Sequence, residues 1–184
     1  MHKVALSLPV ILMTLRLTVP AQTDPKSAAT PKPAAETMQV YTNLNQLMRG
    51  VLYPAANVVF SAPSDDPATV KRPPGVDPSL ATDPLVSTFG GWLAVENAAL
   101  ALTESANLLL IPGRQCANGV PAPTNSPDWT RFVQDLRDAG VKAYKAAQSK
   151  NQDEMIEVAD TLTKACAGCH RKWREKPRPA DRCK

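Results

Sequence analysis

The sequence predicts an all-α protein that folds as an antiparallel four-helix bundle. Four segments repeat apolar residues at intervals of three and four, which places them along one face of a helix. Alanine, leucine and valine dominate the composition, and only 5% of the residues are aromatic. The 18 prolines indicate helices separated by proline-rich connections rather than a sheet. These observations predict four helices that each bury one stripe in a shared core.

Residues 1–21 have the pattern of a secretory signal peptide. A short basic start precedes a short apolar run, and Val19-Pro20-Ala21 offers small residues for cleavage. The run falls well short of the roughly 20 apolar residues that span a bilayer, so we expect no membrane span. We expect export to the periplasm, with residues 22–35 as a flexible Pro/Ala-rich tether in front of the domain.

The bundle is predicted over residues 36–176, and its first helix over residues 36–60. Pro54 lies inside this helix and should kink it or end it early, because proline cannot donate a backbone hydrogen bond. A Pro-rich loop over residues 61–89 follows, and its length indicates either a functional loop or a packed crossover. The inner face of the first helix is predicted to comprise Val40, Leu44, Leu47, Val51, Ala55 and Val58.

Start and stop residues mark the other three helices. The second helix is predicted over residues 92–111, where Pro112-Gly113 stops it. Ser126 is the expected N-cap of the third helix, which runs to about residue 149. Asn151 begins the fourth helix, which continues to about residue 176, and a basic tail over residues 177–184 ends the chain. The short link between the last two helices predicts that they are neighbours.

The fourth helix carries Cys166-Ala167-Gly168-Cys169-His170, a C-x-x-C-H run. If the helix continues through it, Cys166, Cys169 and His170 stand at i, i+3 and i+4 and share one face. In an exported protein this spacing is the attachment signature of a c-type haem, because both thiols can add to the haem vinyl groups while the imidazole reaches the iron. The motif therefore predicts one covalent haem c on the C-terminal helix.

Three other interpretations of this motif exist. A thioredoxin-like redox pair expects a βαβ pattern, whereas the sequence before Cys166 is helical. In a structural zinc site Cys116 and Cys183 could complete a Cys3His set, but no second C-x-x-C or H-x-x-H spacing supports it. The third is a chance match with a plain disulfide or free thiols. The predicted export favours haem attachment over all three.

Cys116 and Cys183 lie outside the motif. In an up-down-up-down bundle the connection between the second and third helices lies at the same end as the C-terminus of the fourth helix. Both cysteines are therefore expected at one end of the molecule. A disulfide between them is one outcome, and two free or mispaired thiols are the other.

The position of the motif carries a family resemblance. A C-x-x-C-H run on the last helix of a four-helix bundle, extended here to C-A-G-C-H-R-K-W-R, resembles the class II c-type cytochromes, the cytochrome c-prime family. The resemblance covers residues 36–176. It implies that Cys166 and Cys169 form the thioethers and that His170 is the axial iron ligand.

The resemblance also gives roles to the residues after the histidine. Arg174 matches the arginine that the family carries close to the proximal side of the haem. Trp173 replaces the tyrosine that is usual there, and we expect its ring to cover the haem edge. The alternative for Arg174 is one more solvated charge in a basic stretch.

The same resemblance implies that the sixth iron position is filled from the first helix, by methionine or by an apolar residue that leaves the iron open. Met48 falls about where the family's distal residue falls, although Leu44 replaces the arginine often found one turn earlier. A methionine at helical spacing can equally be core filler. A His/Met pair would suit electron transfer, whereas a pocket of Leu44, Leu47 or Leu52 would predict binding of gases such as nitric oxide.

The net charge and the residues of the first predicted helix narrow the classes of function that the sequence supports. The formal net charge of +4 falls to about +2 once Lys3 and Arg16 leave with the predicted signal peptide, and this balance gives no support for nucleic-acid binding. The first helix offers no histidine for proton transfer, so we expect a carrier and not an enzyme. The basic C-terminal stretch could steer an acidic redox partner protein. A homodimer formed through the first two helices is expected by the resemblance alone.

Overall fold

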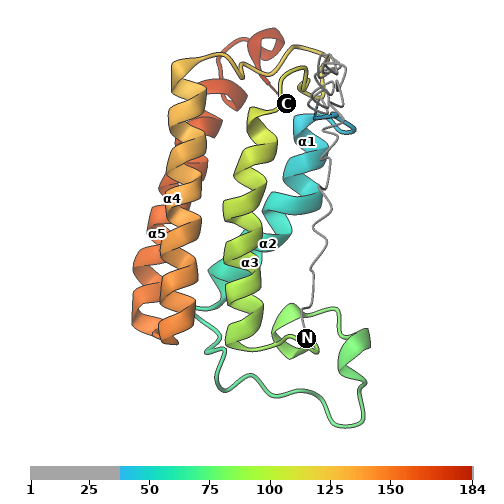
Figure 1. The fold of residues 1–184 in the computed structure, drawn as a ribbon, viewed down its shortest axis with the longest axis vertical. Coiled ribbons are helices and arrows are strands. Elements are labelled where there is room, and N and C mark those ends of the chain that lie inside the picture. The colour runs from blue at the N-terminus through green and yellow to red at the C-terminus, as the bar shows by residue number, and fades with distance from the viewer. Residues whose placement is uncertain (1–37, 184) are drawn as a thin grey trace, which may run out of the picture. The chain divides into compact units, whose positions relative to one another are not determined.

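The computed structural model describes residues 38–183, and every regular element within this range is helical. The predicted signal peptide over residues 1–21 and the tether over residues 22–35 lie outside the described residues. Four long helical stretches run alongside one another (Figure 1). The predicted all-α class with four helices is confirmed. No helix within residues 38–183 is both long and apolar enough to cross a membrane.

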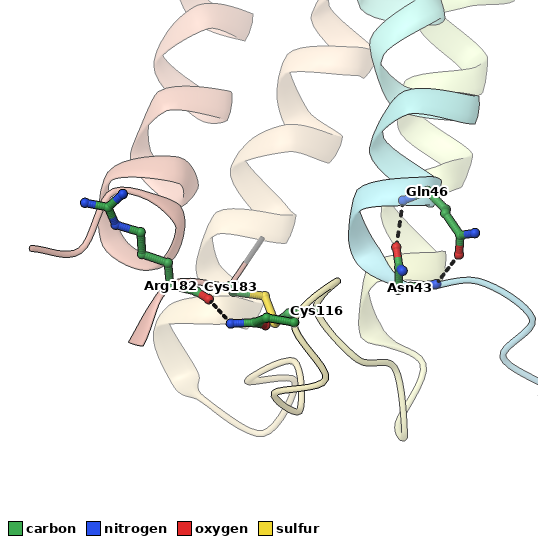
Figure 2. Close-up of a disulfide and its surroundings, with 6 residues drawn as sticks. Asn43, Gln46, Cys116, Arg182 and Cys183 are labelled. Carbon is green, nitrogen blue, oxygen red and sulfur yellow. Dashed lines mark hydrogen bonds between the residues drawn. A yellow bond between two sulfur atoms is a disulfide. The ribbon is translucent and has the colours of Figure 1, made fainter. Parts of the chain in front are cut away.

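The first stretch has three parts: α1 (Leu44–Leu47), a π-helical segment (Met48–Leu52) and α2 (Tyr53–Ser61). The predicted start at residue 36 is wrong, because Asn43 and Gln46 form a capping box. The Gln46 N–H donates to Asn43 Oδ1 at 2.9 Å, and the Asn43 N–H donates to Gln46 Oε1 at 3.0 Å (Figure 2).

Contacts distant in sequence also fix this start. The Arg114 side chain, which is buried, donates from Nη1 to the Thr42 carbonyl at 2.7 Å, and the Leu44 N–H donates to the Gln115 carbonyl at 2.8 Å. These bonds hold residues 42–44 against the connection between the second and third stretches. The backbone in front of Leu44 is therefore satisfied without joining the helix.

Pro54 does not end the first helix. The π-helical segment directly before it changes the hydrogen-bonding register at the position where the missing proline N–H and the ring would disturb an α-helix. This register change also corrects the predicted inner face. Val51 was expected to face the core, but 37% of it is exposed, whereas its neighbour Leu52 is buried.

The loop after α2 contains two 3₁₀ turns, Pro78–Leu80 and Pro84–Val86. Asp77 and Asp83 cap them by accepting backbone N–H bonds, each at 2.9 Å. Arg72 joins the loop to itself by donating to the carbonyls of Val86 and Ser87. The segment predicted to lack regular structure is thus organised by short local turns.

The remaining helices agree with the predicted order. They are α3 (Trp92–Ser105), which continues as a 3₁₀ turn to Leu110, α4 (Pro127–Ser149) and α5 (Gln152–Cys169). Asn151 caps α5 by accepting from two backbone N–H groups, as predicted. Ser126 occupies the N-cap position of α4, but its hydroxyl makes no capping bond. A π-helical segment, His170–Arg174, extends α5.

Candidate functional site

One cavity of about 440 Å³ lies between the helical stretches at the end of α5, within the range of roughly 300–1,000 Å³ usual for ligand sites. Its wall is mostly apolar and comes from all four stretches. The lining residues on the first stretch are Leu44, Asn45, Met48, Arg49, Leu52, Tyr53, Ala56 and Phe60. Those on the other stretches include Leu102, Leu109, Trp129, Phe132, Val133, Leu136, Ala165, Cys166, Cys169, His170, Trp173 and Arg174.

The C-x-x-C-H residues line this cavity together. Cys166 and Cys169 lie in the last turn of α5, and His170 begins the π-helical segment that follows. Both thiols are free and half-buried. Gly168 lies between them, and a Cβ there would stand 2.6 Å from Phe132 Cε1. A glycine at this position therefore lets the motif approach the aromatic wall contributed by α4.

The electrostatics of these groups follow from the apolar wall. Burial raises the pKa of the Cys166 thiol. Burial and the adjacent Cys166 raise the pKa of Cys169 to about 12. Burial, followed by the positive charge of Arg174, lowers the pKa of His170. At neutral pH the cavity thus presents two protonated thiols and a neutral imidazole, which has a nitrogen lone pair available for a metal.

The geometry bears on two of the alternative interpretations. A thioredoxin-like pair lowers the pKa of its attacking thiol, commonly at a helix N-terminus, whereas this pair lies at a helix C-terminus and its pKa values are raised. A Cys3His zinc site would need either Cys116 or Cys183 as a third thiolate, but these two are bonded to each other. Within residues 38–183 no three His, Cys, Asp or Glu side chains gather as a metal site.

Three aromatic rings form the wall beside the motif. The rings of Trp129 and Trp173 meet edge-on with centroids 5.1 Å apart, and Phe132 meets Trp173 in the same manner at 5.5 Å. Trp173 is only 8% exposed, and the Trp129 indole donates to the Leu109 carbonyl at 2.9 Å. Trp173 therefore lies at the cavity, where its ring can pack against the edge of a flat ligand.

The first stretch supplies the opposite wall. Met48 is half-buried and lines the cavity, and Leu44 and Leu52 line it one turn to either side. Leu47, which was also considered for this wall, is buried elsewhere in the core. The lining residues Leu44, Met48, Leu52, Ala56 and Phe60 follow one another at intervals of four.

A run of every fourth residue drifts around an α-helix, which has 3.6 residues per turn. The π-helical segment Met48–Leu52 has a wider turn that offsets this drift, so the run remains on one wall. The strict spacing of four, with Pro54 inside the run, was the indication in the sequence that these residues share one wall. An alternation of three and four predicted a different face.

The polar part of the cavity lining was not predicted from the sequence. Asn45, Arg49 and Tyr53 repeat at the same interval of four, one residue after the apolar series. Arg174 was predicted near the cavity and lines it, while Arg174 Nη2 also pairs with Glu175 Oε1 at 2.9 Å in a half-exposed contact. Arg49 could not be told apart from the other surface arginines by its residue type. Its place in the lining becomes visible only when the helix register is known.

The disulfide alternative for the remaining cysteines is confirmed. Cys116 and Cys183 are bonded, with their Cα atoms 5.0 Å apart (Figure 2). Cys183 lines the cavity, and its N–H donates to the Trp173 carbonyl at 2.9 Å. The disulfide therefore fastens the chain after the motif to the connection between α3 and α4.

Comparisons of this chain with protein-family models, with curated proteins and with solved structures found no match.

Proposed function

We propose that this chain is an exported, periplasmic monohaem c-type cytochrome of the class II kind, an antiparallel four-helix bundle with its haem on the C-terminal helix, and that it carries electrons. The observation that carries the proposal is the meeting of Cys166, Cys169 and His170 in one apolar cavity. Met48 lines the same cavity from the first helical stretch. Two free thiols and an imidazole at this spacing fit the attachment of one haem.

Attachment requires only groups that this chain holds and the two vinyl groups of the haem. Cys166 and Cys169 would each hold the haem through a thioether, with the sulfur on one carbon of a vinyl group and the thiol hydrogen on the other. No atom leaves, and neither oxidant nor reductant is consumed. The pairing of Cys116 with Cys183 keeps those two thiols out of the reaction and leaves Cys166 and Cys169 available.

His170 and Met48, which line the same cavity, would be the two protein ligands of the iron. The bound haem supplies a one-electron iron couple, and a His/Met pair raises its potential and excludes small ligands. Trp129, Phe132 and Trp173 would shield the macrocycle from water. This arrangement suits electron transfer and needs no proton-handling residue beside the iron.

Binding of a small gas such as nitric oxide is the second candidate. Leu44 and Leu52 flank Met48 on the same wall, and a thioether on a flexible side chain can pack against them instead of binding iron. The iron would then be five-coordinate beneath an apolar wall. The choice between the two functions therefore depends on Met48.

A redox partner protein of acidic surface is part of the proposal. The segment after the motif is rich in exposed or half-exposed basic side chains: Arg171, Lys172, Arg174, Lys176, Arg178 and Arg182. Clustered charge of one sign raises encounter rates with an oppositely charged partner. Pairing of two chains through the first two helices is proposed only from the family resemblance.

The deciding experiment is mass spectrometry and absorption spectroscopy of the exported protein, with Met48→Ala and Met38→Ala beside it. We expect a covalent mass increase of one haem and a methionine-to-iron charge-transfer band that only Met48→Ala removes. Met38 is the matched control because it is 68% exposed and lies outside the cavity. A high-spin spectrum in all three proteins would favour gas binding, and a chain without covalent haem would overturn both functions.

A further inference from the structure

The polar residues of the cavity lining lie at its mouth. Arg49, Tyr53 and Arg174 are exposed and Asn45 is half-exposed, whereas the leucines and alanines of the wall are buried. Arg49 comes from the first helical stretch, and Arg174 comes from the end of the last. The cavity therefore has an apolar interior and a cationic rim that two different stretches contribute.

A second hollow opens beside this rim. It is lined by Asn45, Arg174, Glu175 and Arg182, and shares Asn45 and Arg174 with the main cavity. Three guanidinium groups thus lie at or beside the mouth, counting Arg49. The one carboxylate among them, Glu175, is already paired with Arg174. The rim keeps a net positive charge in front of an apolar space.

The C-terminal tail is fastened where Arg182 reaches this hollow. The disulfide holds the next residue, Cys183 (Figure 2). Asn118 Nδ2 donates to the Arg182 carbonyl at 2.7 Å. The Arg182 guanidinium itself donates to the carbonyls of Lys176 and Pro177. These bonds orient the side chain and leave further N–H groups of the fork for a ligand.

We propose that Asn45, Arg49, Arg174 and Arg182 form a carboxylate-binding rim that receives the two propionate groups of the haem and so determines which edge of the macrocycle faces solvent. The inference rests on the proposed haem and deepens it. Planar guanidinium groups suit carboxylates because they donate two parallel hydrogen bonds. The rim also gives the disulfide-linked tail a role, which is to place Arg182 beside the ligand.

The test separates the rim from covalent attachment. The full chain with Cys166→Ala and Cys169→Ala is titrated with metal-free protoporphyrin IX and, separately, with its dimethyl ester. Trp129 and Trp173 line the cavity, so quenching of their fluorescence reports binding. The two porphyrins share the ring and differ only at the edge that the rim would contact, where the diacid carries two carboxylates and the diester two uncharged methyl esters.

We expect the diacid to bind at least about tenfold more tightly than the diester, because only the diacid offers carboxylates for charge-assisted hydrogen bonds with the rim. Arg49→Gln, Arg174→Gln and Arg182→Gln should each lower this preference about threefold or more, a smaller factor because the rim is partly exposed to water. Arg178→Gln should leave it unchanged, because Arg178 pairs with Asp181 on the same tail and lines neither hollow.

The ratio of the two affinities is measured within each variant, so a variant that merely folds poorly weakens both porphyrins and leaves the ratio intact. Equal binding of diacid and diester by the parent chain would overturn the rim and leave the proposed haem site standing. An unchanged ratio in all three arginine variants would also overturn it. If neither porphyrin quenched the tryptophans, the proposed function and the rim would fall together.

Discussion

The two halves of α4 face different surroundings. Its first half presents large side chains, Trp129, Phe132, Val133 and Leu136, to the cavity. Its second half presents small ones, and the buried residues there are Ala139, Gly140, Ala143, Ala146 and Ala147. A Cβ on Gly140 would stand 2.4 Å from Thr103 Oγ1, so α4 and α3 are as close there as a glycine permits.

This difference shows how helices can be packed tightly at one end and leave a cavity at the other. We call the part of the molecule around the cavity the open half, and the part where α4 packs against α3 through Gly140 the closed half. Small residues let backbones approach, so the interior fills without a void. Large rings hold the neighbouring helices apart and leave space that their own atoms do not occupy. The open half is therefore held together by other means, namely the Cys116–Cys183 disulfide, the Asn43–Gln46 capping box and the buried Arg114 side chain.

The largest expected effect comes from removing the disulfide of the open half with Cys116→Ser and Cys183→Ser. The bond joins residues 67 apart in sequence. Closing a loop of this size restricts the unfolded chain, and its loss should lower the free energy of unfolding by about 4 kcal/mol. Urea denaturation of the parent and the double variant measures this difference.

A reducing agent provides the control for this measurement. It should destabilise the parent by a similar amount and leave the double variant unchanged. A loss below about 1 kcal/mol would contradict the view that the open half depends on covalent closure, since native disulfides usually contribute about 2–5 kcal/mol.

Exchanging an alanine for leucine should have different effects in the closed half, at Ala143 of α4, and in the cavity wall, at Ala165 of α5. Ala143 is fully buried between α4 and its neighbours, so Ala143→Leu has no space and should cost about 1–3 kcal/mol through overpacking. Ala165→Leu places the same added atoms in the cavity and should cost less than about 1 kcal/mol in the chain without haem. Chemical denaturation of the Cys166→Ala, Cys169→Ala background measures both.

The same two substitutions should affect porphyrin affinity in the opposite order to their effect on stability. Ala165→Leu should block the diacid porphyrin, and Ala143→Leu should leave its affinity unchanged as long as the variant is folded. If Ala165→Leu destabilised the chain as much as Ala143→Leu did, the open half would be as tightly packed as the closed half. The cavity would then not be a binding space.

Residue spacing along the chain correctly predicted those features of the molecule that depend only on neighbouring residues. The positions i, i+3 and i+4 bring Cys166, Cys169 and His170 to one cavity because helical spacing alone determines their shared face. The caps and breaks around α3, α4 and α5 marked their ends for the same reason. These features need no knowledge of the tertiary structure.

The missed features depend on contacts distant in sequence. The first helix begins at Leu44 and not at residue 36, partly because Arg114 and Gln115 bind the backbone in front of it. The π-helical turn before Pro54 moved Val51 to the surface and every fourth residue to the cavity wall. The cationic rim requires both this register and the folded tail, so Arg49 and Arg182 could not be singled out beforehand.

The smallest expected effect concerns an ion pair at the edge of the open half. Asp128, in the first turn of α4, pairs with Lys172 after the motif and with Arg131 at 3.6 Å. Hydrogen bonding and the charge of Lys172 lower the pKa of Asp128 below its ordinary value of 3.8. A carboxylate with a depressed pKa stabilises the fold above its ordinary pKa, and this contribution is lost as pH falls through the depressed value.

Asp128→Asn should therefore lower the stability slightly at about pH 7, and the difference from the parent should disappear towards about pH 2, where the carboxylate is protonated. The effect is small because both partners are exposed to solvent. Asp135→Asn is the matched control, because Asp135 pairs with Arg131 within α4 alone and joins no other segment. A difference that persisted at acidic pH would mean that Asp128 acts through packing or helix capping, and the tie between α4 and the motif segment would not be electrostatic.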